Sequence, residues 1–91
     1  MARIVVRMFA TVREAAGVPS AVVDASDLDE LFMKLGDSFG TGLSELLRDA
    51  KSDPERLVVL LNGKNIGLSR TRRARLSDGD EIAIFPPVSG G

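Results

Sequence analysis

The stretch "SDGDEIAIF", residues 77–85, decides the fold, because it combines a tight turn with a β-strand that follows at once. In the turn, Gly79 permits the positive φ that such a reversal needs. In the strand, Ile82 and Ile84 alternate with residues of the opposite face, which is the period-two pattern of a strand with one buried side. We therefore predict that a strand at residues 81–85 completes a sheet formed by the preceding chain.

Three earlier segments also have strand patterns. The alternation of Ile4, Val6 and Met8 with their neighbours predicts a strand at residues 3–9 with one buried face. "SAVVDA" predicts a second strand at residues 20–25, with "TVREAAG" (11–17) as the loop of the hairpin between them. "LVVLL" at 57–61 predicts a buried strand. It runs into Asn62-Gly63, the strongest local hairpin signal, after which we expect a short strand.

Helical spacing dominates the middle of the chain. One apolar face is predicted for the main helix, formed by Leu28, Leu31, Phe32 and Leu35. Ser26 and Asp29 are expected to cap its start. Three glycines, Gly36, Gly40 and Gly42, are expected to interrupt it, and a second short helix is indicated by Leu43, Leu46 and Leu47. Asp53-Pro54 has the pattern of a further helix start. "GTG" at 40–42 lacks the rest of a nucleotide-binding motif, so we interpret it as a helix break.

Composition limits the possible functions. The chain has 91 residues, enough for a single domain at 1–91, and four Phe without Trp or Tyr predict an aliphatic core. The net charge of −1 argues against nucleic acid or membrane as a partner. No run approaches the length of a membrane span, so we expect a soluble, cytoplasmic protein.

Metal and thiol chemistry also have little support. The chain contains no Cys and no His, which removes disulfides, thiol nucleophiles and the usual zinc ligands. Acidic residues crowd at 27–30 and 78–81. The dipole of a helix N-terminus explains the first group and a turn explains the second, so we predict no metal site.

Two hairpin-like halves around one helix favour an α+β domain of β-grasp architecture. The segments "MFATVREAAG" (8–17), "LLNGKNI" (60–66) and "LSDGDEIAIFPPVSGG" (76–91) resemble the MoaD/ThiS-like sulfur carriers of the ubiquitin superfamily, most of all the small subunit of molybdopterin synthase. The resemblance implies a mixed four- to five-stranded sheet packed on one main helix. It also implies that residues 86–91 form an extended tail.

The tail has a pattern that suits chemistry at a chain end. Pro86 and Pro87 end sheet pairing and keep the departing chain stiff, and Val88 and Ser89 follow them. Gly90 and Gly91 have no Cβ, so they can enter a narrow active site. A doublet of glycines alone is weak evidence, but here it follows directly on a predicted strand and two prolines, which makes the pattern specific.

The resemblance implies a role for Gly91. An adenylating enzyme of the ubiquitin-activating type uses ATP to convert the C-terminal carboxylate to an acyl-adenylate. A sulfur donor protein then gives a thiocarboxylate, which supplies sulfur to a molybdopterin precursor on the large subunit of molybdopterin synthase. The chain itself would bind no cofactor and bring no catalytic side chain, which leaves open whether it counts as an enzyme or only as the sulfur-carrying subunit.

Other fates of the same adenylate stay open. Attack by a lysine amine would make the chain a ubiquitin-like protein modifier, and its own possible acceptors are Lys34, Lys51 and Lys64. Thiolation of tRNA or thiamin synthesis are alternative sulfur pathways. A non-catalytic β-grasp interaction module, with an inert tail, is a further alternative.

Partner contacts are expected near the start of the tail. The resemblance assigns Phe9, Arg13 and Phe85 to the surface used by the activating enzyme or the large subunit, although both Phe side chains would also suit a core. The sequence departs from the family pattern at "SRTRRAR", which contains Arg70, Arg72, Arg73 and Arg75. We interpret these arginines as a solvated loop or a patch that docks an acidic partner.

Overall fold

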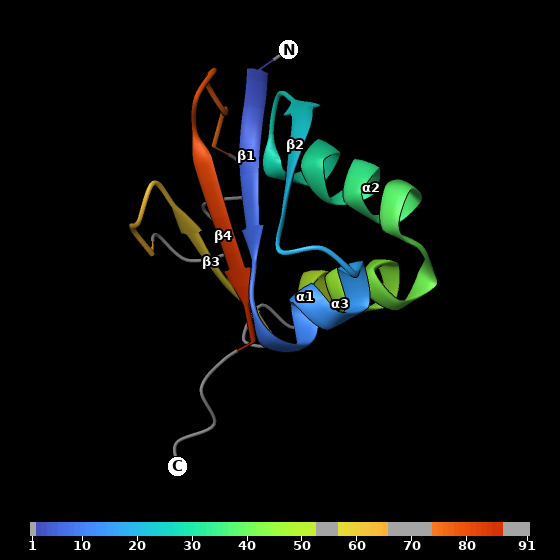
Figure 1. Cartoon of the computed structure of the whole chain (residues 1–91). Coiled ribbons are helices and arrows are strands. Elements are labelled where there is room, and N and C mark those ends of the chain that lie inside the picture. Colours follow the sequence, from blue (N-terminus) through green and yellow to red (C-terminus); the bar gives the residue numbers. More distant parts are fainter. Residues whose placement is uncertain (1, 53–56, 66–73, 87–91) are drawn as a thin grey trace.

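The computed structural model describes residues 2–52, 57–65 and 74–86. Its elements are, in chain order, β1 (Ala2–Met8), α1 (Ala10–Ala16), β2 (Ser20–Ala25), α2 (Leu28–Phe39), α3 (Thr41–Ser52), β3 (Val58–Leu61) and β4 (Glu81–Phe85). The helices gather on one side of the sheet (Figure 1). No helix within these described ranges is long and apolar enough to cross a membrane.

The four strands form one mixed sheet in the order β2-β1-β4-β3. The first and last strands, β1 and β4, are parallel neighbours at its centre, with Val6 opposite Ile82. The two outer pairs, β1 with β2 and β3 with β4, are antiparallel. The strand predicted at 81–85 thus completes the sheet, and the β-grasp prediction is confirmed.

The core is almost entirely aliphatic, as composition predicts. Alternate residues of β1 and β4 point to the helices and are buried, among them Ile4, Val6, Ile82 and Ile84. The predicted apolar face of α2 packs against them, with each of its four residues buried: Leu28, Leu31, Phe32 and Leu35. The pattern in sequence and the packing in space therefore agree for the elements that define the fold.

The loop predicted at 11–17 is wrong, because most of it forms α1. This helix has only seven residues, which is too short to be stable in isolation. Burial of Val12 against the core stabilises it, and Gly17 ends it in the left-handed conformation with φ of 80°. The helix depends on tertiary contacts, so the local sequence signal for it is weak.

The predicted cap of the main helix is displaced by one residue. Asp27, not Ser26, is the N-cap, and its carboxylate accepts a hydrogen bond from the Glu30 N–H at 2.8 Å. The Glu30 carboxylate in turn accepts from the Ser26 N–H at 2.7 Å. Each side chain satisfies a backbone donor at the helix start, as in a capping box.

Two of the three predicted helix interruptions are also wrong. Gly40 does separate α2 from α3, but Gly36 lies inside α2 and Gly42 inside α3. At Gly36 a Cβ would lie 3.2 Å from the Cβ of Ser44. This glycine is therefore explained by the close approach of α3, not by a break in the helix.

The predicted turns are confirmed where the structure describes them. Asn62 and Gly63 both have positive φ, 51° and 82°, and Gly79 has φ of 86°. Leu61 and Lys64 exchange backbone hydrogen bonds across the Asn62-Gly63 turn at 2.9 and 3.0 Å. Two further predictions, the helix start at Asp53-Pro54 and most of the short strand after Lys64, fall outside the described residues.

Candidate functional site

The candidate site lies where β4 ends and the tail begins. Because β1 and β4 are parallel, their carboxyl ends lie at the same edge of the sheet (Figure 1). There the Phe9 N–H donates a hydrogen bond to the Ile84 carbonyl at 3.1 Å. We call the surface formed by Phe9, Arg13, Phe85 and Pro86 the tail root.

The two aromatic rings of the tail root contact each other. Phe9 and Phe85 pack edge to face, with ring centroids 6.1 Å apart and an interplanar angle of 84°. Such aromatic pairs are favourable beyond the area that they bury. Phe9 is 45% exposed and Phe85 is half-buried, so neither belongs to the fully buried core. The structure therefore places the pair on the surface, beside the start of the tail.

A sharp change of backbone direction places Arg13 near this pair. Phe9 is the N-cap of α1 and has an extended backbone, whereas Ala10, directly after it, has φ of 52°. That value is uncommon for a residue with a Cβ. The Phe9 carbonyl accepts hydrogen bonds from the N–H groups of Val12 and Arg13 at 3.1 and 3.3 Å. Arg13 thus lies one helical turn from Phe9, and its side chain is exposed.

The tail root adjoins the face of the sheet opposite the helices, which we call the open face. Apolar residues from all four strands share it: Val5, Val22, Leu60, Ala83 and Phe85. Val22 is 57% exposed, and the other four are half-buried. Sequence reasoning missed Val22 and Leu60 as surface residues. The alternation in "SAVVDA" indicates that Val22 and Val23 face opposite sides of the sheet. Only the strand register shows that Val22 lies beside Val5 and Leu60 beside Ala83.

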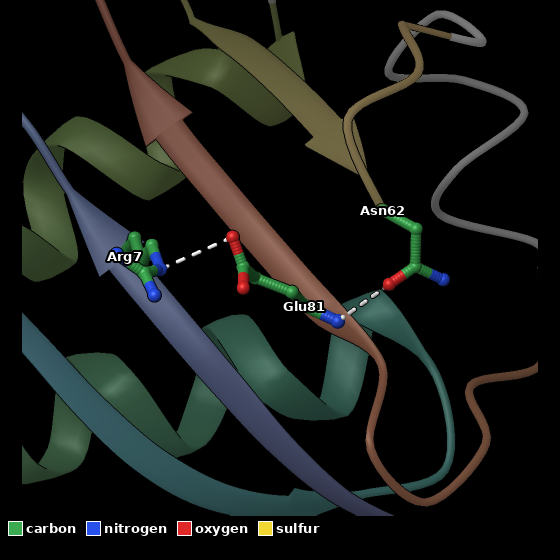
Figure 2. Close-up of polar contacts among 3 residues, drawn as sticks. All are labelled: Arg7, Asn62 and Glu81. Atoms are coloured by element: carbon green, nitrogen blue, oxygen red, sulfur yellow. Dashed lines mark hydrogen bonds and ion pairs between the residues drawn. The ribbon is translucent and has the colours of Figure 1, made fainter.

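Polar contacts fix β4 at the end opposite to the tail root (Figure 2). The Asn62 side-chain carbonyl accepts from the Glu81 N–H at 2.8 Å, and the Asn62 N–H donates to the Glu81 carbonyl at 2.8 Å. The Asn62 amide nitrogen donates to Asp80 at 3.0 Å. Glu81 also pairs with Arg7 of β1 at 3.1 Å. One turn residue thus anchors the start of the strand that delivers the tail.

We expect Asn62→Gly to lower the free energy of unfolding by about 1–2 kcal/mol. Glycine adopts the positive φ of Asn62 without strain, so the loss comes from the two side-chain hydrogen bonds together with the greater freedom of glycine in the unfolded chain. Chemical denaturation measures the change. Lys64→Ala in the same exposed turn is the control, with a change within about 0.5 kcal/mol. Equal stability of Asn62→Gly and the parent protein would show that the side-chain bonds add nothing.

The acidic clusters are engaged in the fold. Asp27 caps α2, and Asp78 accepts a hydrogen bond from the Arg3 N–H at 2.6 Å. Within residues 2–52, 57–65 and 74–86, no three His, Cys, Asp or Glu side chains gather in a way that would hold a metal ion.

Of the remaining predicted site residues, the structure describes only Arg75, and it does not bring this residue to the tail root. Arg75 is exposed and forms an isolated bridge with Asp27, just before α2. Asp27 follows the end of β2 that pairs with Ala2, at the far end of β1 from Phe9. The other predicted positions lie outside the described residues: Arg70, Arg72, Arg73, Pro87, Val88, Ser89, Gly90 and Gly91.

Comparisons with known proteins agree with this fold over nearly the whole chain. The sequence model of the ThiS family matches residues 6–91. Small archaeal modifier protein 3 of Haloferax volcanii is 32% identical over 88 residues, which span 93% of this chain and 95% of that protein.

Solved structures give the same result. The solution structure of small archaeal modifier protein 1 from Methanosarcina acetivorans has a TM-score of 0.76 and 32% identity, and it covers 100% of this chain and 98% of its own. A complex of subunits 1 and 2 of molybdopterin-converting factor from Helicobacter pylori contains a chain with a TM-score of 0.67 and 30% identity, covering 98% of this chain and 99% of that one.

Proposed function

The chain belongs to the ThiS family of ubiquitin-like sulfur carriers and modifiers, and from this membership we propose that it carries sulfur as a thiocarboxylate on Gly91 for molybdopterin synthesis. The observation that supports the proposal most is the position of β4. This strand is held at the centre of the sheet and ends with the aromatic pair of the tail root, where the segment leading to Gly90 and Gly91 begins.

The proposed chemistry needs only the carboxylate of Gly91. One of its oxygens attacks the α-phosphorus of ATP in the partner enzyme, which releases pyrophosphate and forms an acyl-adenylate. A persulfide of a donor protein then displaces AMP and forms an acyl disulfide. A thiol of a partner protein attacks the donor's sulfur in this S–S bond, which forms a new disulfide and releases the thiocarboxylate. After the sulfur has attacked the pterin precursor, water cleaves the bond between the Gly91 carbonyl carbon and the sulfur, which leaves the sulfur on the precursor and restores the carboxylate for another cycle. ATP is therefore a substrate of the partner and not a cofactor of this chain.

The tail root and the open face together suit the docking of such partners. Exposed aromatic side chains with a positive charge beside them are typical of interface hot spots. Among the described residues, Arg13 forms no ion pair, so its guanidinium is available to a carboxylate of a partner. The large subunit of a molybdopterin synthase is our proposed acceptor, because subunit 1 of molybdopterin-converting factor is a relative that is solved together with subunit 2.

Mass spectrometry of the protein purified from its native cells tests the proposal directly. We expect a species whose mass exceeds that of the 91-residue chain by the difference between sulfur and oxygen, with the change located on Gly91. The same spectrum determines whether the native chain ends at Gly91. A native chain that continues beyond this residue, or one that never carries sulfur when the pathway is active, would contradict the proposal.

Protein modification is a second candidate function, favoured by the similarity to small archaeal modifier proteins. In that case a lysine amine of another protein attacks the adenylate or a thioester formed from it, and an isopeptide bond to Gly91 results. Proteolysis of native cell extracts would then give lysine peptides that carry a remnant of the Gly90-Gly91 tail. Detection of this remnant on foreign proteins supports modification, and its absence in cells that contain the thiocarboxylate supports sulfur transfer alone.

We expect Phe85→Ala and Phe9→Ala each to weaken binding to the activating enzyme by about 10- to 100-fold, as is usual for aromatic hot spots. Titration calorimetry against that enzyme measures the effect. Met33→Ala is the control, because Met33 is 57% exposed but lies on α2, across the molecule from the open face. Binding that falls no more for either Phe variant than for Met33→Ala would remove the tail root from the interface.

A further inference from the structure

The helical side of the molecule has a groove that the proposed chemistry does not use. It lies between α2 and α3, has a volume of about 220 Å³ and is lined by Phe32, Met33, Gly36, Asp37, Ser44, Leu47 and Arg48. Phe32 and Leu47, each only 3% exposed, form its apolar base. All of its residues come from the two helices, so the groove is separate from the open face and the tail root.

One residue of the groove's lining is an apolar side chain that is also largely exposed to solvent. Met33 is 57% exposed and is one of three exposed large hydrophobic side chains in the described part of the chain. A methionine is unbranched and flexible, so it fills irregular apolar recesses well. The same face therefore has both an exposed apolar side chain and a groove large enough to bind a side chain of that size.

The rim of the groove has one negative and one positive group. Asp37 lies one turn after Met33 on α2, and Arg48 lies one turn after Ser44 on α3. Both side chains are exposed, and neither forms an ion pair or a side-chain hydrogen bond in the parts of the chain that are described. The two charges of opposite sign are thus available to a partner.

We propose that the groove is the interface of a symmetric dimer of this chain. A two-fold axis brings the same patch of both copies together, so each feature must meet its own complement. Here Met33 of each copy enters the groove of the other, and Asp37 of each copy pairs with Arg48 of the other. An interface of this size is small, so the dimer is weak. Both open faces and both tail roots stay accessible in it.

Charge reversal tests the symmetry of the contact. Asp37→Arg places two like-charge contacts in the symmetric dimer, and Arg48→Asp does the same with opposite sign. We expect each variant alone to dissociate at about tenfold higher concentration than the parent protein or more, as measured by sedimentation over micromolar to millimolar concentrations. An equimolar mixture of the two variants restores both pairs, so it should dimerise as strongly as the parent protein.

Asp49→Arg is the matched control, because Asp49 is an exposed acid on α3 that does not line the groove. It should leave the dimer unchanged. Unfolding midpoints of all variants should agree, since each altered residue is exposed. A parent protein that stays monomeric at millimolar concentration would overturn the proposal. So would a mixture that does not reassociate, or a groove that binds a different protein while the chain itself is monomeric.

Discussion

Removal of Gly90 and Gly91 is expected to abolish the formation of acyl-adenylate and thiocarboxylate while leaving the fold intact. The truncated chain ends at Ser89, so its carboxylate no longer reaches the ATP bound by the activating enzyme. Stability should change by no more than about 0.5 kcal/mol, because the last strand that the structure describes ends at Phe85, four residues before Ser89. Mass spectrometry after incubation with ATP, activating enzyme and sulfur donor measures the first effect, and chemical denaturation measures the second.

A variant in which both glycines become alanine separates two requirements of the tail. It keeps the length and the terminal carboxylate but adds two Cβ atoms, so reduced charging of this variant would show that the active site accepts only a narrow chain. Normal charging of the truncated protein would refute the role of Gly91. A loss of several kcal/mol in the truncated protein would show that the tail is part of the folded structure.

We expect Ile84→Ala to cost about 2–5 kcal/mol of folding stability, the largest effect of any substitution considered for the fold. Ile84 is fully buried on the central strand β4, between Met8 of β1 and Val59 of β3. Its removal leaves a cavity in the core shared by the sheet and the helices. Small domains are stable by only about 5–15 kcal/mol, so the variant should unfold at a much lower denaturant concentration.

Val22→Ala is the control for this substitution. Val22 is also an aliphatic strand residue, but it is 57% exposed on the open face, so its truncation should cost less than about 0.5 kcal/mol. Equal losses for both variants would mean that the two faces of the sheet are not divided into a core face and a surface face as described.

Sequence reasoning succeeded where burial imposes a regular period. The alternation of Ile4, Val6 and Met8 and that of Ile82 and Ile84 predicted two strands with correct buried faces. The spacing of leucines predicted the main helix. Each of these elements covers a large part of the core, and a misplaced polar residue there would be costly, so the sequence must repeat the pattern.

The predictions from sequence failed where tertiary contacts decide the local structure. The seven-residue α1 is stabilised by its contact with the core, and its amino-acid sequence is also compatible with a loop. Gly36 fits a helix break in isolation, but its close neighbour is Ser44, which belongs to the next helix. The residues around Gly36 in the sequence do not show that Ser44 will be its neighbour in space.

The site was predictable only in part for a related reason. Alternation indicated that Phe85 faces away from the core, and the structure adds that its ring contacts Phe9, far from it in the sequence. No pattern in the sequence indicated the groove on the helical side, because its residues, such as Met33 and Arg48, come from two different helices and share no motif. Surfaces of this kind depend on how elements pack and not on the order of residues.

The pairing of β1 with β4 has a consequence for the synthesis of the protein. These neighbours are the first and the last of the strands that the structure describes, so a growing polypeptide on the ribosome contains β1 for a long part of translation without its central partner. Pairing over such a sequence separation is also slow to form. The sheet therefore closes only after residues 81–85 have left the exit tunnel. A polypeptide whose translation stops before residue 81 lacks β4, so it has neither a closed sheet nor the Phe9–Phe85 pair that we propose the activating enzyme recognises.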